Sequence, residues 1–158
     1  MAVCIVVRGP LGAGKTTVAE ALARAIRAEV VSIDAILETL DWDGGSEELF
    51  LRANLEAAAR VRALTDRGVP AVVDGNFYWR SVADDLEARV SVPCVIFSLQ
   101  VPLEVCLERD RNRPLSYGLE ATREVYEKVA RVSLGTPIDG SQPLDRIVAE
   151  IRSKLPVA

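Results

Sequence analysis

Gly9-Pro10-Leu11-Gly12-Ala13-Gly14-Lys15-Thr16 is the stretch that decides the fold of this chain. An apolar run, residues 2–7, precedes it, and an alanine-rich helical pattern, residues 17–27, follows it. This is the G-x-x-x-x-G-K-[ST] pattern between a strand and a helix, in which backbone N–H groups and the helix N-terminus surround a phosphate. Glycine permits the backbone angles that such a turn needs. The sequence therefore predicts a phosphate-binding loop.

Two side chains of this loop have specific expected roles. We expect Lys15 to reach the β- and γ-phosphates of a nucleotide and the Thr16 hydroxyl to ligate Mg²⁺. The alternative is a glycine-rich turn without a ligand, but every motif position is filled, and this favours the phosphate loop. The expected nucleotide-binding residues are Gly9, Pro10, Leu11, Gly12, Ala13, Gly14, Lys15, Thr16 and Thr17.

The composition limits the classes of function that are open to the chain. Its 158 residues, 49% of them hydrophobic, are enough for one domain with a substantial core, so we treat residues 1–158 as a single domain. The net charge of -4 gives no overall basic field for long nucleic acid. Histidine is absent, which excludes histidine bases, Ser-His-Asp triads and histidine metal sites. Any proton acceptor is therefore expected to be a carboxylate.

The cysteines and the first residues bear on where the protein works. Cys4, Cys94 and Cys106 lie apart, without zinc or redox spacing, so we expect them to pack in the core. The start of the chain leads directly into the phosphate loop without a basic leader, and no apolar run reaches membrane-spanning length. We therefore expect a cytoplasmic protein that does not enter the membrane.

Strands and helices alternate along the whole chain. We expect strands at 2–7, 29–33, 70–74, 92–99 and 136–139, and helices at 17–27, 35–40, 46–66, 80–89, 103–111, 120–134 and 144–155. This alternation predicts a parallel sheet with helices on both faces. Ligands of such sheets bind at the carboxyl ends of the strands, where Asp34, Asp74 and the loop at Gly9 fall.

Two aspartates at strand ends are candidates for chemistry. Asp34 could accept the proton of an attacking hydroxyl or hold it in line with the γ-phosphate, and it could also cap a helix that begins at Ala35. Asp74 follows an apolar strand and could hold Mg²⁺ together with Thr16, although many strands simply end in an Asp-Gly turn.

Residues beside this predicted crevice are candidates for binding a phosphate acceptor. Asn76 and Arg80 flank the three aromatic residues 77–79, at least one of which we expect in the core. Trp42 could pack on a ring, and Arg52 could bind an anionic group. The full expected acceptor site is Asp34, Trp42, Arg52, Asp74, Asn76 and Arg80.

A second strong signal is the pair Arg109 and Arg113, four residues apart on one helical face. Arginines near a helix end often only offset the helix dipole. Here a segment with Gly118 follows, so we predict a lid over approximately 109–122 that closes on the nucleotide. The expected catalytic residues are Lys15, Asp34, Arg109 and Arg113.

Through these residues the chain resembles small phosphate-loop kinases of the nucleoside-monophosphate-kinase-like group. This group includes shikimate, gluconate and adenylate kinases and polynucleotide 5′-hydroxyl kinases, and many members have only a generic AAA-type ATP-binding label. The resemblance covers the whole chain and rests on residues 9–16, Asp34, residues 72–76 and Arg109-x-x-x-Arg113. Residues 138–145 are similar to the segment that packs near the adenine in this group.

The resemblance implies an α/β fold of three layers, the P-loop NTPase fold. It implies a five-stranded parallel sheet of order 2-3-1-4-5 with helices on both faces, a small lid, ATP as donor and Mg²⁺. It also implies that Asp34 matches the general base of polynucleotide-kinase-like members, that Arg109 stacks near the adenine and that Arg113 reaches the phosphates.

The expected function is an ATP-dependent kinase that phosphorylates a hydroxyl group of a small molecule or of a nucleic-acid end. The acidic composition favours a small molecule. One alternative is a nucleoside monophosphate kinase, but the helix at 35–40 lacks the arginine usual in adenylate kinases. Another is a nucleotide-binding ATPase switch, although the sequence has no Asn-Lys-x-Asp motif. Both a monomer and a homodimer remain open.

Overall fold

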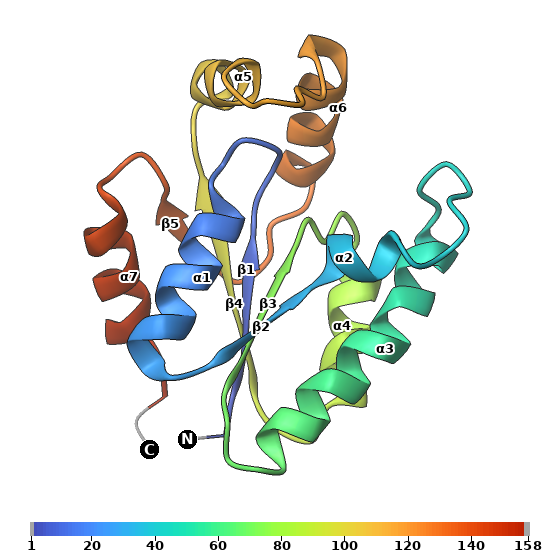
Figure 1. Cartoon of the computed structure of the whole chain (residues 1–158), viewed down its shortest axis with the longest axis vertical. Coiled ribbons are helices and arrows are strands. Elements are labelled where there is room, and N and C mark those ends of the chain that lie inside the picture. Colours follow the sequence, from blue (N-terminus) through green and yellow to red (C-terminus); the bar gives the residue numbers. More distant parts are fainter. Residues whose placement is uncertain (1, 157–158) are drawn as a thin grey trace.

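A parallel sheet lies between two layers of helices in the computed structural model, which describes residues 2–156 (Figure 1). The strands are β1 (Cys4–Arg8), β2 (Glu29–Ser32), β3 (Ala71–Gly75), β4 (Cys94–Gln100) and β5 (Thr136–Asp139). They pair in the order β2-β3-β1-β4-β5, and all pairs are parallel. The expected order is thus confirmed. Because β1 is central, the loop that follows it lies in the middle of the carboxyl edge of the sheet.

Seven helices in the described residues connect and cover these strands. They are α1 (Lys15–Ile26), α2 (Ile33–Leu37), α3 (Glu47–Thr65), α4 (Arg80–Arg89), α5 (Leu103–Arg111), α6 (Leu119–Ala130) and α7 (Leu144–Ser153). The helices α1 and α7 cover one face of the sheet, and α3 and α4 cover the other (Figure 1). Within residues 2–156, no helix has the combination of length and hydropathy that a bilayer crossing requires.

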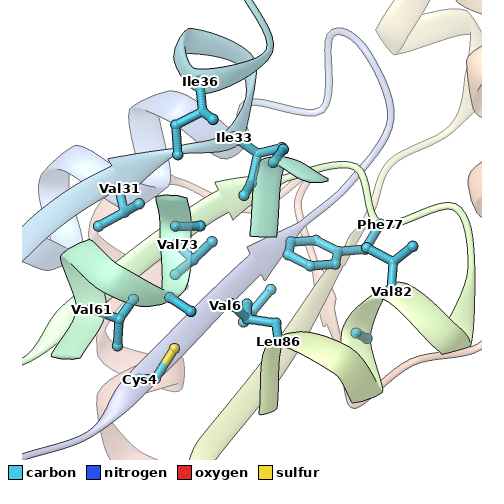
Figure 2. Close-up of a cluster of buried hydrophobic side chains, with 14 of the residues drawn as sticks. Cys4, Val6, Val31, Ile33, Ile36, Val61, Val73, Phe77, Val82 and Leu86 are labelled. Carbon is cyan, nitrogen blue, oxygen red and sulfur yellow. The ribbon is translucent and has the colours of Figure 1, made fainter. Parts of the chain in front are cut away.

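The central strand is buried on both faces, which explains its continuous apolar sequence. Successive side chains of a strand point to opposite faces, so Cys4 and Val6 pack against α3 and α4 while Ile5 and Val7 pack against α1 and α7. Figure 2 shows the first of these clusters, in which Phe77 from the segment after β3 packs among the aliphatic side chains. This places at least one of the aromatic residues 77–79 in the core, as expected.

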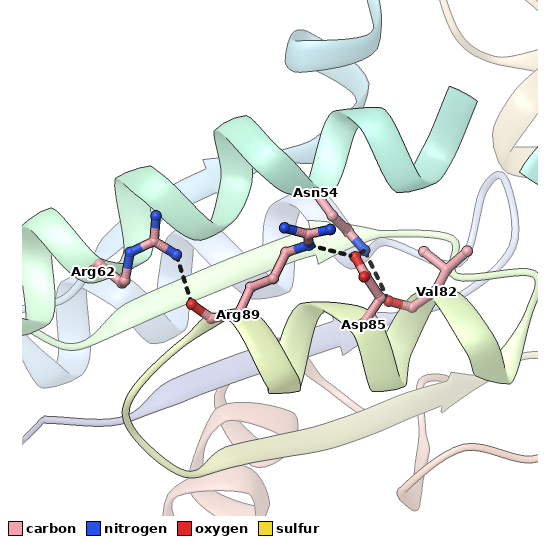
Figure 3. Close-up of polar contacts among 5 residues, drawn as sticks. All are labelled: Asn54, Arg62, Val82, Asp85 and Arg89. Atoms are coloured by element: carbon pink, nitrogen blue, oxygen red, sulfur yellow. Dashed lines mark hydrogen bonds and ion pairs between the residues drawn. The ribbon is translucent and has the colours of Figure 1, made fainter. Parts of the chain in front are cut away.

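Polar contacts fix α4 against α3. The buried Asn54 amide on α3 donates to the Val82 carbonyl at 2.9 Å and to Asp85 Oδ2 at 3.0 Å (Figure 3). Arg89 Nε donates to the same carboxylate oxygen at 2.9 Å, and Arg62 donates to the Arg89 carbonyl at the end of α4. Because α4 follows directly after the segment 76–79, these contacts also fix one end of that segment.

The start of α2 differs from the expected one. The helix begins at Ile33, and the Ser32 hydroxyl caps it by accepting a hydrogen bond from the Ala35 N–H at 3.1 Å. The expectation that Asp34 caps this helix is therefore wrong. Serine is as good a cap as aspartate, and its position before Asp34 in the chain leaves the Asp34 carboxylate available.

The helix expected over 120–134 ends earlier, at Ala130. Carbonyl groups of the residues after this helix accept hydrogen bonds from side chains elsewhere in the chain. Arg80 donates to the Ser133 carbonyl, and the Ser98 hydroxyl donates to the Leu134 carbonyl, both at 2.6 Å. These long-range contacts replace the helical hydrogen bonds. The helix at 103–111 and the helix start at Ser46, by contrast, match the expectation.

Candidate active site

The loop 9–16 connects β1 to α1 and has the conformation that its glycines allow. Gly12 and Gly14 have φ of 78° and 89°, in the left-handed region that favours glycine. At Gly12 a side chain is also excluded by space, because a Cβ there would lie 2.5 Å from the carbonyl oxygen of Cys106 in α5. The loop ends at the N-terminus of α1, where unpaired N–H groups and the helix dipole favour an anion.

A cavity of about 350 Å³ opens over this loop. The residues that line it are Pro10, Gly12, Gly14, Lys15, Thr16, Thr17, Arg109 and Arg113. The structure thus brings the expected phosphate ligands and both lid arginines together around one cavity. Its volume is in the range of sites for small molecules.

The two arginines reach the cavity from α5 and from the segment after it. Arg109 Nη1 donates to the carbonyl oxygens of Gly12 and Ala13, both at 3.2 Å, so its guanidinium lies directly on the phosphate loop. The guanidinium carbon of Arg113 is 4.9 Å from the centre of the Tyr117 ring, a cation–π contact within the segment 112–118. The expected lid is thus divided into the end of α5, the segment 112–118 and the start of α6.

Asp74 lies at the end of β3 beside Thr16. The Thr16 hydroxyl donates to Asp74 Oδ2 at 2.8 Å, whereas the buried Oδ1 has no hydrogen-bond partner within the described residues. Burial raises the pKa of Asp74, and the charges of Asp34 and Glu20 raise it further, although Lys15 and the Thr16 hydrogen bond oppose the rise. A buried carboxylate oxygen without a partner is suited to a cation.

The hydroxyl of Thr16 and the free oxygen of Asp74 fit Mg²⁺, which prefers oxygen ligands. No group of three or more metal-ligating side chains occurs in residues 2–156. An ion at this place would therefore take its other ligands from phosphate oxygens and water, as Mg²⁺ at a phosphate site usually does.

Asp34 lies in the first turn of α2, close to the same edge of the sheet. Its charge contributes to the raised pKa of both Asp74 and Tyr78, so it lies near both side chains. Burial is the main cause that raises the pKa of Tyr78 to about 12, followed by Asp34 and by Glu124 on α6. Lys128, also on α6, has its Nζ 5.6 Å from the centre of the Tyr78 ring. Helix α6 is therefore the wall opposite α2.

Two of the expected acceptor ligands have other partners. The buried Asn76 amide donates to the carbonyl of Gly9 at 3.1 Å and so supports the phosphate loop. Arg80 donates to the carbonyl of Ser133, behind α6. Both side chains are occupied by backbone carbonyls, which differs from the acceptor contacts expected for them.

The two remaining expected residues lie at the rim. Trp42 is 64% exposed in the connection between α2 and α3, and Arg52 is exposed on α3. Tyr78 and Trp79 pack edge-on against Phe50, with ring centres 5.5 and 5.4 Å away. These three aromatic side chains thus form one cluster between α3 and the segment after β3.

Asp110 is a residue that the sequence reasoning missed. It is almost fully covered and accepts hydrogen bonds from the Ser116 hydroxyl at 2.6 Å and from the N–H groups of Tyr117 and Gly118 at 3.0 and 3.1 Å. Burial alone would raise the pKa of Asp110, but these bonds outweigh it and hold the pKa below its usual value. A signal existed, because a carboxylate in the last turn of a helix opposes the helix dipole and needs another reason to be there.

Arg8 is the second missed residue. It is the last residue of β1 and directly precedes the phosphate loop, yet only 2% of it is exposed. The signal was a charged residue at the end of an otherwise apolar strand, a position where burial is expensive unless the charge has partners.

Comparison with known proteins agrees with this geometry. A sequence profile of the AAA domain family matches residues 4–133. A shikimate kinase of Corynebacterium diphtheriae is 31% identical in an alignment 162 positions long, which covers 93% of this chain and 91% of that protein.

Solved structures share the fold. A gluconokinase from Sinorhizobium meliloti has a TM-score of 0.75 at 22% identity, over 94% of this chain and 89% of the other. A sugar kinase from Janibacter sp. has a TM-score of 0.79 at 21% identity, over 97% of this chain and 94% of the other. At this identity the two structures speak for the fold alone.

Proposed function

Since the chain belongs to the AAA domain family and is a small phosphate-loop kinase, we propose that it transfers the γ-phosphate of ATP to a hydroxyl group of a small molecule. The observation that carries this proposal is the cavity over loop 9–16, which Lys15, Thr16, Arg109 and Arg113 line together. We extend the proposal to residues 1–158 as one kinase domain.

The residues of the cavity can stabilise a transferring phosphate. Phosphoryl transfer depends mainly on positioning and on neutralising charge. The loop amides and Lys15 hold the β- and γ-phosphates, and Arg113 approaches them when the segment 112–118 closes. Mg²⁺, held by Thr16 and Asp74, supplies positive charge to the phosphate oxygens when bound. Arg109 lies on the loop, toward the adenine, with residues 138–145 as the adenine-facing segment.

Asp34 is the proposed general base. Its carboxylate does not cap the helix and lies near Asp74 and Tyr78, at the edge of the sheet that bears the phosphate loop. A hydroxyl group bound there donates its proton to Asp34 as its oxygen attacks the γ-phosphate.

The charges around the acceptor space favour a small molecule over a nucleic-acid end. Asp34, Asp74 and Glu124 bring carboxylates to it, and Lys128 already pairs with Glu124 at 3.3 Å. Such a surface repels the phosphates of a nucleic acid. The relatives are named as kinases of shikimate, gluconate and a sugar, which supports a small hydroxyl compound here. Trp42 and Arg52 are the proposed rim of this acceptor site.

A panel of acceptors with γ-labelled ATP tests the proposal. We expect the native protein to label at least one small hydroxyl compound faster than it hydrolyses ATP. Lys15→Ala should lose both transfer and ATP affinity. Asp34→Asn should keep ATP affinity and lose roughly 10²–10⁴-fold in transfer rate, the usual contribution of a general base.

Three results would contradict the proposal in different ways. If phosphate transfer to every acceptor is slower than ATP hydrolysis, the protein is not a kinase of the compounds tested. Labelling of nucleoside monophosphates alone would indicate a nucleoside monophosphate kinase. ATP hydrolysis that Asp34→Asn leaves unchanged, with no labelled acceptor, would indicate an ATPase switch.

A further inference from the structure

Arg8 is a buried charge whose contacts are all neutral. Its Nε donates to the carbonyl of Phe77 at 3.0 Å, its Nη1 to the Ser98 hydroxyl at 3.2 Å and its Nη2 to the carbonyl of Val129 at 2.9 Å. The ion pairs found within residues 2–156 do not include Arg8. Burial, and secondarily Arg80, lower the pKa of Arg8 to about 10, so the guanidinium is still charged at neutral pH.

Stability is a poor explanation for this arginine. A charge taken out of water is costly, and an apolar side chain of similar volume is often as stabilising at such a place. The partial negative charge at the C-terminus of α6, where the Val129 carbonyl lies, offsets only part of that cost. The arrangement of its partners offers a better explanation.

Two of the three partners of Arg8, Phe77 and Val129, belong to different parts of the proposed active site. Phe77 follows Asp74 and Asn76 and precedes Tyr78, whose pKa the charge of Asp34 helps to raise. Val129 is in the last turn of α6, the wall that bears Glu124 and Lys128 and that continues from the lid segment 112–118. Arg8 itself leads into the phosphate loop.

One of these bonds acts at a residue with an unfavourable backbone conformation, and the other acts beside a cavity. Phe77 has φ of 49°, a left-handed conformation that is unfavourable for a bulky residue, and Arg8 binds the carbonyl of that residue. Below the last turns of α6, a cavity of about 500 Å³ separates this helix from β4 and β5 and is lined by Arg8, Ser98, Tyr126 and Val129 among others. The contact of Arg8 with Val129 bridges α6 to β1 where apolar packing is missing.

We propose that Arg8 is a positioning residue. It fixes α6 and the segment 76–79 relative to the phosphate loop, so that the lid and the acceptor are both correctly placed around the γ-phosphate. This inference rests on the proposed kinase function. Arg8 does not line the cavity over the loop, where we place the triphosphate of ATP. It acts through Phe77 and Val129.

The test compares Arg8→Met, Arg8→Lys and Arg8→Ala with Arg24→Met, the same substitution at an exposed position of α1. Three quantities are measured: the affinity for Mg-ATP, kcat and KM for the best acceptor, and backbone amide exchange with a non-hydrolysable ATP analogue bound. Methylguanidinium is added to Arg8→Ala as a replacement for the missing group, since the adjacent cavity gives it room.

In Arg8→Met we expect Mg-ATP affinity within about threefold of native, while kcat falls roughly 10–100-fold because small misplacements of reacting groups are costly. Amide exchange should rise about tenfold or more in 76–79 and 127–134 and stay unchanged in α1. Arg8→Lys should be intermediate, since one ammonium group cannot reach all three partners. Methylguanidinium should restore part of kcat in Arg8→Ala and should have no effect on Arg24→Met.

The proposal is overturned if Arg8→Met keeps native kcat and native exchange in both segments. It is also overturned if exchange rises evenly over the whole chain and methylguanidinium restores nothing, because that pattern indicates a general loss of stability. The exchange measurement needs no acceptor. If the native protein phosphorylates nothing, the kinase function fails while the exchange pattern still decides whether Arg8 holds these segments.

Discussion

Asp74 illustrates how a residue can be costly to the fold and necessary to the site. One of its oxygens binds the Thr16 hydroxyl and the other is buried without a partner in the described chain. An ionised carboxylate in that environment destabilises the folded protein until a cation arrives.

The substitution Asp74→Asn separates these two effects. The raised pKa of Asp74 means that this group favours the fold below the ordinary carboxyl pKa of about 3.9, and that this advantage is lost as pH rises through the raised value. Asparagine stays neutral and keeps an oxygen for Thr16. Without ligand at pH 7, we therefore expect a Tm higher by about 2–4 °C, the shift that 1 kcal/mol produces at this chain length.

Thermal unfolding between pH 4 and 8, with and without Mg-ATP, measures this. The difference in Tm between the Asp74→Asn variant and the native protein should shrink toward pH 4, and the added stability from Mg-ATP should be smaller in the variant. The exposed Asp84→Asn on α4 is the control. A variant that is less stable than native at pH 7 without ligand would contradict this account of Asp74.

Residues of the site differ in how far the sequence alone predicts them. Lys15 and Thr16 were predictable because a local motif fixes their spacing and their chemistry together. Arg8 was not, since its partners Phe77, Ser98 and Val129 lie 69, 90 and 121 residues away. Asn76 was expected on the acceptor, but its amide binds Gly9, a contact that only the pairing of β1 with β3 creates.

At the scale of elements, one carboxylate organises the segment 112–118, which belongs to the proposed lid. Asp110 binds one side chain and two backbone N–H groups in the segment that follows α5, so it keeps Arg113 close to the cavity. Its lowered pKa means that this contribution is present above the ordinary carboxyl pKa and is lost as pH falls through the lowered value.

We expect Asp110→Asn to loosen the segment 112–118, because the amide oxygen is a weaker acceptor than the carboxylate. Trypsin should cut after Arg111 several-fold faster, by roughly the factor that 1 kcal/mol of lost local order gives, whereas Pro114 protects the bond after Arg113. In this variant the fold-decrease in ATP affinity should be smaller than the fold-decrease in kcat. Glu108→Gln, exposed on α5, is the control. Unchanged cleavage after Arg111 in the variant would refute this role.

Element boundaries followed from the sequence where local signals act alone. Residues 103–111 form a helix as expected, and Ser46 caps α3. The end of α6 was not predictable, because Arg8, Arg80 and Ser98 bind carbonyls of its last turn and of the segment after it. The local sequence does not predict contacts with three distant segments.

For the whole molecule, the order β2-β3-β1-β4-β5 brings distant segments to one edge. The phosphate loop, Asp34, Asp74 and helix α6 meet there, and the resemblance to phosphate-loop kinases predicted this order correctly. The residues that bind the acceptor stay a prediction, since an acceptor is recognised by side chains whose orientation depends on the packing of α3, α4 and α6. Arg80, which binds the Ser133 carbonyl, is the example.

Both proposals require that the loop 9–16 holds the triphosphate of ATP with Mg²⁺. Isothermal titration calorimetry of ATP into the native protein, with and without Mg²⁺, and into Lys15→Ala measures this most directly. We predict one binding site per chain that weakens at least about tenfold without Mg²⁺ and at least about as much in Lys15→Ala, as expected for the loss of one strong charge contact. Folded native protein that takes up no ATP, or that binds it equally well without Mg²⁺ and without Lys15, would contradict the account.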